Sequence, residues 1–546
     1  MLVGYVSDER YVAVADALLE FESLDPPEAQ QGQPHRPTTA VRSTARGAVY
    51  ADLPPGPYRV TLVKSGFGSK SVELTVARDA PAHHFRLLSD GLLGYMWPKW
   101  VRSGERSEFR VHAVAPYRLS LWRYGWNKEL VRLLGWFDEH GPRAVMQLTP
   151  DGDYTQSGVA WNRVGYGNNP HLTQFVVGPE RSGLYYLHAE AESGGAVFTF
   201  PWIVAPDRPR APVAVLASTN TWNAYNNFGG RSNYINSDAL PPRPTVNARQ
   251  DLHRYTQIGI FNTWGFADEA YAPLSFERPE PDNHVPPQVQ VTDPIRGRAA
   301  CHLAPAEWRL LGWLEREGFA YDLYAEAQLH QGQLDLDAYR VLILNAHPEY
   351  WSRAMYERVK AWVHQRGGRL MYLGGNGINC EVELIDQATM RCKTHRQRPG
   401  ETPDAPPGES RFRRTVESEA ALLGVAFTDT GIMTAAPYRV LQASHWVFAG
   451  TGLRDGDLFG TESQHERCPG GASGHETDKI DPASPPGTQL LAKGLNPDNG
   501  GAEMAYYELP QGGAVFAAGS IIWPSSVLVD EHVSRITRNV LRRFLT

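Results

Sequence analysis

The sequence predicts a multidomain protein in which two N-terminal β-sandwich domains precede one α/β domain built on a parallel sheet. The chain has 546 residues, far more than one hydrophobic core organises, because domains average about 150 residues. Residues 1–90 alternate apolar and polar side chains in short runs, which is typical of half-buried strands, and residues 91–206 form a second β-rich region. Beyond residue 212 the runs become continuously apolar, as in strands that helices cover on both faces.

Residues 1–90 are predicted to form the first β-sandwich. The segment 50–76 consists of strand-like pieces separated by Pro-Gly and Gly turns, YADLPPGPYRVTLVKSGFGSKSVELTV. Residues 52–66 also resemble the hairpin of the carboxypeptidase-regulatory or transthyretin-like module. We therefore expect a small sandwich of that type at the start of the chain.

Residues 91–206 are predicted to form a second β-sandwich. The strand candidates are separated by Gly and Asp turns and are SEFRVHAV, YRLSLWRYG, GLYYLHAEA and AVFTFPWIV. The segment PDRPRAP at 206–212 has the composition of a linker. We therefore expect a change of architecture there.

Residues 207–546 are predicted to form the α/β domain, of a flavodoxin-like or glutamine-amidotransferase-like type. In the segment 307–318 the apolar side chains Trp308, Leu311 and Leu314 share one helical face. The segment 339–375 predicts a strand, a helix and a second strand, the unit that joins parallel strands by a right-handed crossover. A later apolar run, GAVFAAGSI, and a closing helix, EHVSRITRNVLRRF, complete this domain.

Composition argues against several classes of partner. Lys and Arg number 53 against 60 Asp and Glu, a net charge of −7, so the chain has no overall attraction for nucleic acid. No run offers the roughly 20 apolar residues that a membrane span needs. Asp8, Glu9 and Arg10 interrupt the position of a signal-peptide core, and the four cysteines contain no Cys-x-x-Cys pair. We therefore expect a cytoplasmic protein without a nucleic-acid or membrane partner.

Ligands of open parallel sheets bind beside the carboxyl ends of the strands, and two predicted strands end in polar segments. The strand 213–217 continues into STNTWNAYNNFGGRSNY, which supplies Tyr225 and Tyr234; the alternative is a turn-rich surface loop whose tyrosines pack on the sheet. The strand 341–345 continues into AHPEYWS, where His347 and Glu349 face one site if the backbone stays extended. A hydrogen-bonded core histidine and a helix-capping glutamate are the alternative here.

A third strand end carries the Gly-rich turn 373–377, which has the pattern of a nucleophile elbow. Asn376 stands where Ser or Cys is expected, and an amide cannot be a covalent nucleophile. We therefore expect hydrolysis by metal-activated water, with Asn376 as a hydrogen-bond donor to the substrate or to a developing oxyanion. Tolerance of a left-handed turn is the structural alternative for Asn376.

Two further patterns concern the metal. Phenolate and carboxylate oxygens together are a hard ligand set, which favours ferric iron over zinc. The segment GHETD at 474–478 supplies carboxylates near a metal or merely caps a turn, and we favour the turn.

Several strings resemble, in the same order, the catalytic domain of the large (beta) subunit of N,N-dimethylformamidase and its relatives. They lie within residues 211–546 and are NTWNAYNNFGGRSNY, LSFERP, HPEYWS, MYLGGN, GHETDKID, GAVFAAGSIIW and TRNVLRRF. In that family two tyrosines and a glutamate hold a mononuclear ferric iron beside a histidine, and the metal activates water to hydrolyse a small amide. The resemblance implies Glu349, Tyr225 and Tyr234 as metal ligands, with Tyr234 matching through a shortened family loop. It also matches His347 to the nearby histidine and Asn376 to the family's Gly-Gly-Asn turn.

With this resemblance, we predict iron-dependent hydrolysis of the C–N bond of a small N-substituted amide. His347, Glu349 and Asn376 are the predicted catalytic residues, and one Fe(III) is the predicted cofactor. The alternative is a noncatalytic protein that binds carbohydrate or a surface, because two sandwich modules precede a domain whose elbow has no nucleophile. A third hypothesis is covalent chemistry through Cys380. We also expect a homo-oligomer, with or without a small partner subunit.

Overall fold

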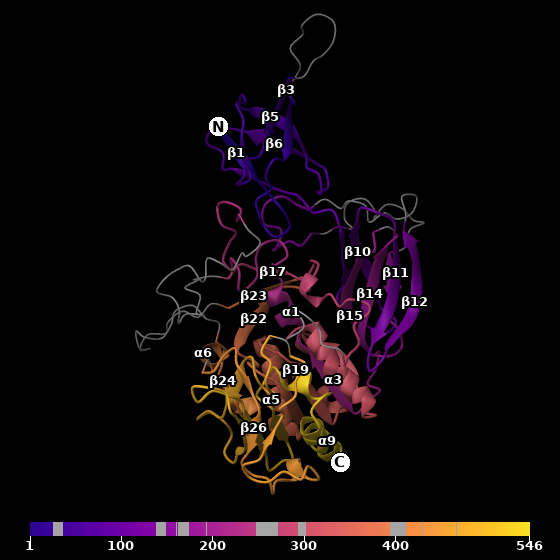
Figure 1. Ribbon diagram of the computed structural model, residues 1–546, viewed down its shortest axis with the longest axis vertical. Helices are drawn as coiled ribbons and strands as arrows, with labels where there is room; N and C mark the ends of the chain where they lie inside the picture. The colour runs from indigo at the N-terminus through magenta and orange to yellow at the C-terminus, as the bar shows by residue number, and fades with distance from the viewer. Residues whose placement is uncertain are drawn as a thin grey trace, which may run out of the picture.

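The computed structural model shows a β-rich chain in which several sheets are stacked along one long axis (Figure 1). It describes residues 1–25, 37–137, 149–159, 161, 174–192, 194–246, 271–292, 302–393, 411–428, 430–465 and 467–546.

Two sheets formed by the first 90 residues share one hydrophobic core. Their strand orders are β4-β1-β7 and β3-β2-β5-β6. Buried side chains from both sheets, among them Val6, Leu19, Val60 and Phe85, pack in one cluster. Along β5 every second residue is buried, as expected for a sheet that covers a core with one face. The strands are β1 (Leu2–Ser7), β2 (Leu18–Ser23), β3 (Thr38–Arg42), β4 (Ala48–Tyr50), β5 (Gly56–Val63), β6 (Lys70–Val76) and β7 (His83–Arg86).

Two more sheets follow, with strand orders β13-β10-β8 and β12-β11-β14-β15-β9. Phe109 from the smaller sheet and Leu121, Leu187 and Trp202 from the larger one share a second core. The predicted domain boundaries after residues 90 and 206 stay predictions. The strands are β8 (Leu92–Trp97), β9 (Trp100–Arg102), β10 (Arg106–Ala113), β11 (Tyr117–Tyr124), β12 (Lys128–Phe137), β13 (Phe175–Val177), β14 (Gly183–Ala191) and β15 (Val197–Ala205).

A nine-stranded sheet is the centre of the remaining chain. Its first five strands in spatial order run parallel, and each strand after β32 pairs antiparallel with its neighbour. In spatial order the strands are β18 (Asp322–Ala325), β16 (Val213–Ala217), β19 (Val341–Ala346), β21 (Arg369–Gly374), β32 (Ala514–Ala517), β31 (Glu503–Glu508), β30 (Gln489–Gly494), β26 (Tyr438–Val440) and β27 (Leu458–Phe459).

The predicted parallel α/β domain of flavodoxin-like or glutamine-amidotransferase-like type is therefore wrong. The sheet is mixed, and the chain as a whole has far more strand than helix. The physical reason is visible in the connections: only residues 509–513 join β31 to β32, whereas a parallel crossover needs a dozen residues or more. Strands joined by such short connections pair antiparallel. The sequence prediction did not consider the length of this connection.

Helices cover both faces of the parallel strands. Val213 and Val215 of β16 share a core with Trp308 of α3, while Ala214 and Leu216 point to the opposite core. This alternation follows from the two-residue repeat of a strand. Among the described residues, the long helices are α3 (Ala304–Arg316), α5 (Arg353–Arg366) and α9 (Glu531–Leu545). Ser352 caps α5 by accepting from the Met355 amide.

Short elements surround this sheet. The helices are α1 (Thr219–Tyr225), α4 (Glu326–His330), α6 (Phe412–Thr415), α7 (Ala420–Leu423), α8 (Trp523–Ser526), η2 (Pro281–Asn283), η4 (Leu336–Ala338) and η5 (Trp446–Phe448). The strands are β17 (Leu274–Ser275), β20 (Tyr350–Trp351), β22 (Cys380–Leu384), β23 (Thr389–Cys392), β24 (Ala426–Thr428), β25 (Ala435–Ala436), β28 (Ser473–Gly474) and β29 (Thr477–Lys479). Within the described ranges, every helix is too short or too polar to cross a bilayer.

Candidate active site

The site lies where three neighbouring parallel strands end. β16, β19 and β21 are adjacent in the sheet, and their carboxyl ends lie at one edge. The chain continues from them into α1, into His347–Glu349 and into the turn at Asn376. The sheet thus brings together three segments that are far apart in the sequence. They meet beside the carboxyl ends of parallel strands, where ligands of open sheets bind.

α1 carries the first predicted ligand, Tyr225, as its last residue. The sequence indicated a loop here, but residues 219–225 form a short helix whose first six residues are buried. Asn220 Nδ2 donates to the Tyr350 carbonyl at 3.0 Å, and Thr221 Oγ1 donates to the His347 carbonyl at 2.7 Å. These bonds fasten the helix to the segment that follows β19.

Glu349 is the point on which the predicted side chains converge. Tyr234 Oη lies 3.0 Å from both carboxylate oxygens, and Tyr225 Oη lies 3.4 Å from Oε2. His347 Nε2 lies 3.1 Å from Oε2. His347 is fully buried and Glu349 is 4% exposed. All four side chains therefore meet in one cluster, in which His347 and Glu349 are buried and the two tyrosines are half-buried.

A tight turn, rather than extended backbone, brings His347 and Glu349 together. The Glu349 amide donates to the His347 carbonyl at 2.9 Å, and Ala346 has a φ of +54°. The two side chains do meet, but the expectation that an extended backbone brings them together is wrong. The capping alternative for Glu349 is also wrong, because Ser352 caps α5.

Tyr350 is a member of the cluster that the sequence reasoning missed. Its hydroxyl lies 2.7 Å from Tyr234 Oη. In an extended segment the neighbour of Glu349 points to the opposite side, so the spacing of His347 and Glu349 gives no signal for Tyr350. Burial, reinforced by the charge of Glu349, raises the pKa of both Tyr234 and Tyr350 well above the usual value. Both phenols are therefore neutral unless a cation lies beside them.

His347 stands between two carboxylates. Its Nε2 is 3.1 Å from Glu349 and 3.2 Å from Glu476. Burial opposes the charged imidazolium, but the charges and hydrogen bonds of the two glutamates outweigh it and raise the pKa of His347 to about 10. Burial likewise opposes ionisation of Glu476, but the bond with His347 lowers its pKa. The pair is therefore a proton donor beside a proton acceptor.

Glu476 is a further member of the cluster that sequence reasoning undervalued. We favoured a turn-capping role for GHETD, but Glu476 Oε2 accepts from Asn376 Nδ2 at 2.7 Å as well as contacting His347. Asp478 Oδ1 accepts from the Asn376 amide at 2.8 Å. The motif thus supplies two carboxylates to the turn after β21.

Asn376 has the left-handed backbone that the structural alternative predicted, with φ of +52°. It also faces the cluster: Nδ2 donates to Glu476 and lies 3.4 Å from His347 Nε2. Its buried Oδ1 has no hydrogen-bond partner within the described part of the chain. One amide hydrogen is therefore engaged by Glu476, and the oxygen remains available to an incoming group.

A row of buried histidine rings extends from the cluster. His302 lies 4.5 Å from the Tyr225 ring and 5.6 Å from the His347 ring, measured between centroids. His475 lies 5.4 Å from His302, and His465 lies 5.1 Å from His475. These residues come from separate loops without a common motif, so the sequence offered no signal for the row.

Oxygen donors in the cluster fit the predicted ferric ion. Two phenol groups and one carboxylate are hard ligands, which trivalent iron prefers. Oxygens that share one cation at about 2 Å lie about 3 Å apart, close to the 3.0–3.4 Å between the tyrosine hydroxyls and Glu349. Among the described residues, no three His, Cys, Asp or Glu side chains are arranged to hold a metal, so a metal here depends on the tyrosines.

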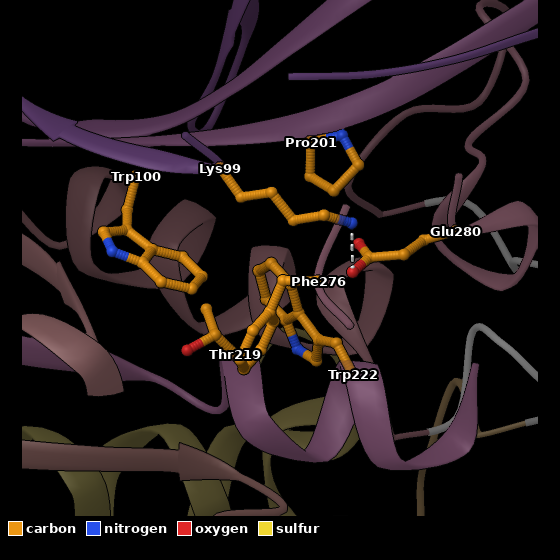
Figure 2. A pocket seen from close by; sticks show the side chains of 7 residues that line it. All are labelled: Lys99, Trp100, Pro201, Thr219, Trp222, Phe276 and Glu280. Atoms are coloured by element: carbon orange, nitrogen blue, oxygen red, sulfur yellow. Dashed lines mark ion pairs between the residues drawn. The ribbon is translucent and has the colours of Figure 1, made fainter. Parts of the chain in front are cut away.

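A small pocket lies beside α1, which contributes Thr219 and Trp222 to its lining (Figure 2). Trp100, Phe276 and Trp222 supply aromatic walls, and the Trp100 and Phe276 ring centroids are 5.2 Å apart. Lys99 Nζ and Glu280 lie 2.6 Å apart inside it, as the dashed line in Figure 2 marks. The charges of Lys99 and Glu280 balance each other. We therefore assign the pocket no catalytic role.

Comparisons with known proteins find similarity over a part of the chain that includes the cluster. The family described as N,N-dimethylformamidase beta subunit-like, C-terminal, matches residues 120–534. The N,N-dimethylformamidase beta subunits of Alcaligenes sp. and Paracoccus aminophilus are each 28% identical over 398 residues, which are 63% of this chain and 50% of the relative. The chain thus spans about half the length of the curated relatives it matches.

Proposed function

The chain belongs to the N,N-dimethylformamidase beta subunit-like family, and we propose on this basis that it hydrolyses the C–N bond of a small N-substituted amide. The observation that carries the proposal is the convergence of Tyr225, Tyr234 and His347 on Glu349 in a buried cluster. Burying so many ionisable groups together destabilises a fold, so a functional reason is expected.

We propose that Tyr225, Tyr234 and Glu349 hold one ferric ion. When bound, this ion supplies Lewis acidity, which lowers the pKa of water and polarises the amide carbonyl. The residues themselves support the assignment: their donor atoms are all oxygens, and Tyr234 needs a neighbouring cation to lose its proton.

His347 and Glu476 are suited to move the protons. Cleavage forms a carbon–oxygen bond and breaks the carbon–nitrogen bond, and the amine leaves only after its nitrogen gains a proton. His347 is placed to hold such a proton, because its buried Nε2 lies between Glu349 and Glu476. The Glu476 carboxylate can take the proton that water loses, and its contact of 3.2 Å with Nε2 returns a proton to His347.

Asn376 has a second role beside the predicted contact with the substrate carbonyl. Its Nδ2 donates to Glu476 and so holds that carboxylate beside His347. Its unpartnered Oδ1 can accept a hydrogen bond from the attacking water or from an amide N–H. We therefore propose that Asn376 orients Glu476 and a hydrogen-bond donor of the substrate complex.

The proposal extends to partners and location. The relatives are named beta subunits, so we propose that this chain assembles with itself or with a smaller partner subunit. We keep the cytoplasm as its proposed location, because four cysteines without a Cys-x-x-Cys pair suit a reducing compartment. The noncatalytic alternative requires no metal, and this separates the two hypotheses.

The deciding experiment is metal analysis of the purified full chain together with its visible spectrum. We expect stoichiometric iron and a phenolate-to-iron absorption band. Glu349→Ala should lose both, and Glu383→Ala, at a residue that is 44% exposed and paired with Arg391, should keep both. A colourless, metal-free wild-type protein, or a Glu349→Ala variant with full iron, would refute the proposal.

A further inference from the structure

We propose that the N-terminal unit β1–β7, together with residues 151–155, is a clamp that positions Tyr234. The segment that it holds is the loop 226–241, which we call the Tyr234 loop. β1–β7 lie outside the residues 120–534 that match the family. The inference rests on the proposed role of Tyr234 as a metal ligand and assigns the N-terminal unit a part in building the site.

The first contact is made by Gly229. Its amide donates to the Glu9 carbonyl at 2.6 Å, and its carbonyl accepts from Arg86 at 2.9 Å. Arg86 is fully buried and also donates to the carbonyls of Asp8 and Gly152. The Arg86 guanidinium, at the end of β7, thus connects the Tyr234 loop to Asp8 and to Gly152.

Gly229 and Gly230 allow the two backbones to approach closely. A Cβ on Gly229 would lie 2.4 Å from Thr155 Cγ2, and one on Gly230 would lie 2.4 Å from Tyr11 Cβ. Both glycines have φ near +100°, which disfavours any other residue. The pair therefore packs directly against the proposed clamp.

Tyr11 makes the second polar contact. Its hydroxyl donates to the Pro241 carbonyl at 2.8 Å, at the far end of the Tyr234 loop. The backbone of Tyr11 also holds the residues just after the Tyr234 loop, because the Thr245 amide donates to the Tyr11 carbonyl at 3.0 Å. Tyr11 adopts a φ of +63°, a strained conformation that surrounding structure must maintain.

Arg231 fastens the middle of the loop. Its Nε donates to Asp153 at 2.7 Å and to Thr155 at 3.0 Å. Its other nitrogens donate to the carbonyls of Ser237 and Pro273, and the side chain is fully buried. Three residues further on, Tyr234 reaches Glu349. The loop contains neither helix nor strand, so these contacts replace the hydrogen bonds of a regular element.

The test compares single-atom changes in the clamp with a matched change outside it. Tyr11→Phe removes the bond to Pro241 together with the 2.8 Å contact to His84 Nδ1. Asp153→Asn removes the charge opposite Arg231. Tyr58→Phe is the control, because its hydroxyl bonds Pro54 inside the same N-terminal unit at 3.0 Å. We expect amide hydrogen exchange of peptides covering 226–241, in full-length protein without added metal, to quicken about fivefold in both clamp variants and not in the control.

The second readout is the absorption band per bound iron, which a purely structural role would not change. Both clamp variants should show a weaker or shifted band, whereas Tyr58→Phe should match wild type. Unchanged exchange, or faster exchange with an unchanged band, would overturn the clamp. If wild type binds no iron, the proposed function fails, and equal exchange rates in Tyr11→Phe and wild type would separately reject the clamp.

Discussion

Glu307 offers a direct test of how burial controls ionisation beneath the site. Its Oε1 accepts from the Ser218 amide at 3.1 Å and from the Trp222 indole at 2.8 Å, so it holds both ends of the first turn of α1. The side chain is 1% exposed, and burial raises its pKa from 4.5 to about 8, outweighing those two bonds and the charge of His347. The perturbation is Glu307→Gln, which keeps the accepting oxygen and removes the ionisation.

The expected effect follows from the two pKa values. Between 4.5 and about 8 the folded protein holds one proton on Glu307 that the unfolded chain has lost. The stabilisation is complete below 4.5 and is lost as the pH rises through about 8. The free energy of unfolding of wild type should therefore fall relative to Glu307→Gln by about 1.4 kcal/mol per pH unit, or about 2.7 kcal/mol between roughly pH 5.5 and 7.5.

Urea unfolding of both proteins at several pH values measures this difference, and other titrating groups cancel because both proteins contain them. Glu317→Gln is the matched control. Burial opposes ionisation of Glu317, but the bond with Arg538 lowers its pKa, so it is charged throughout this range in both states. The stability of Glu317→Gln relative to wild type should stay constant with pH. If the difference in free energy of unfolding between Glu307→Gln and wild type also stays constant with pH, Glu307 is ionised in the folded protein. That result would refute the raised pKa of Glu307.

Three further predictions concern the site. Tyr225→Phe and Tyr234→Phe should each lose iron and weaken the visible band, measured by metal analysis and absorption; a Tyr234→Phe protein with full iron and colour would remove Tyr234 from the ligand set. Glu476→Gln should lower kcat by about two to four orders of magnitude while iron content stays stoichiometric, because its proposed role is proton transfer. Replacing all four cysteines with Ser should leave kcat within about tenfold, and inactivation by Cys380→Ser alone in a folded protein would revive the covalent hypothesis.

The parallel half of the central sheet was predictable because its strands are buried on both faces. Val213–Ala217 appears in the sequence as an unbroken apolar run, and α5 follows β19 with a Ser cap and a Gly end. The antiparallel half of the sheet was not predictable, because its strands are short and the length of the connections decides which strands pair. α1 was also missed: its asparagines and threonines favour turns locally, and only bonds to the following segments make them helical.

For the site, strand ends located His347, Glu349 and Asn376, and the structure brings these residues together; their roles stay predictions. Glu476 and Tyr350 could not be ranked from sequence. Glu476 comes from a loop whose position depends on the whole sheet. A two-residue repeat would point Tyr350 away from Glu349, but the local turn does not follow that repeat. Sequence periodicity describes regular elements, whereas irregular segments place most of this site.

Charge balance in the cluster bears on which metal it can hold. His347 Nε2 lies 3.2 Å from Glu476, so an imidazolium at this position cancels the charge of Glu476. Tyr225 and Tyr234 then face a single carboxylate, Glu349, and together the three side chains carry at most three negative charges once both phenols lose their protons. A trivalent ion neutralises three such charges, whereas a divalent ion leaves one uncompensated in a buried site, at a cost of several kcal/mol in proteins. Burial therefore favours the ferric state that we propose, because the ligand set and the ion then sum to zero in a place that water does not screen.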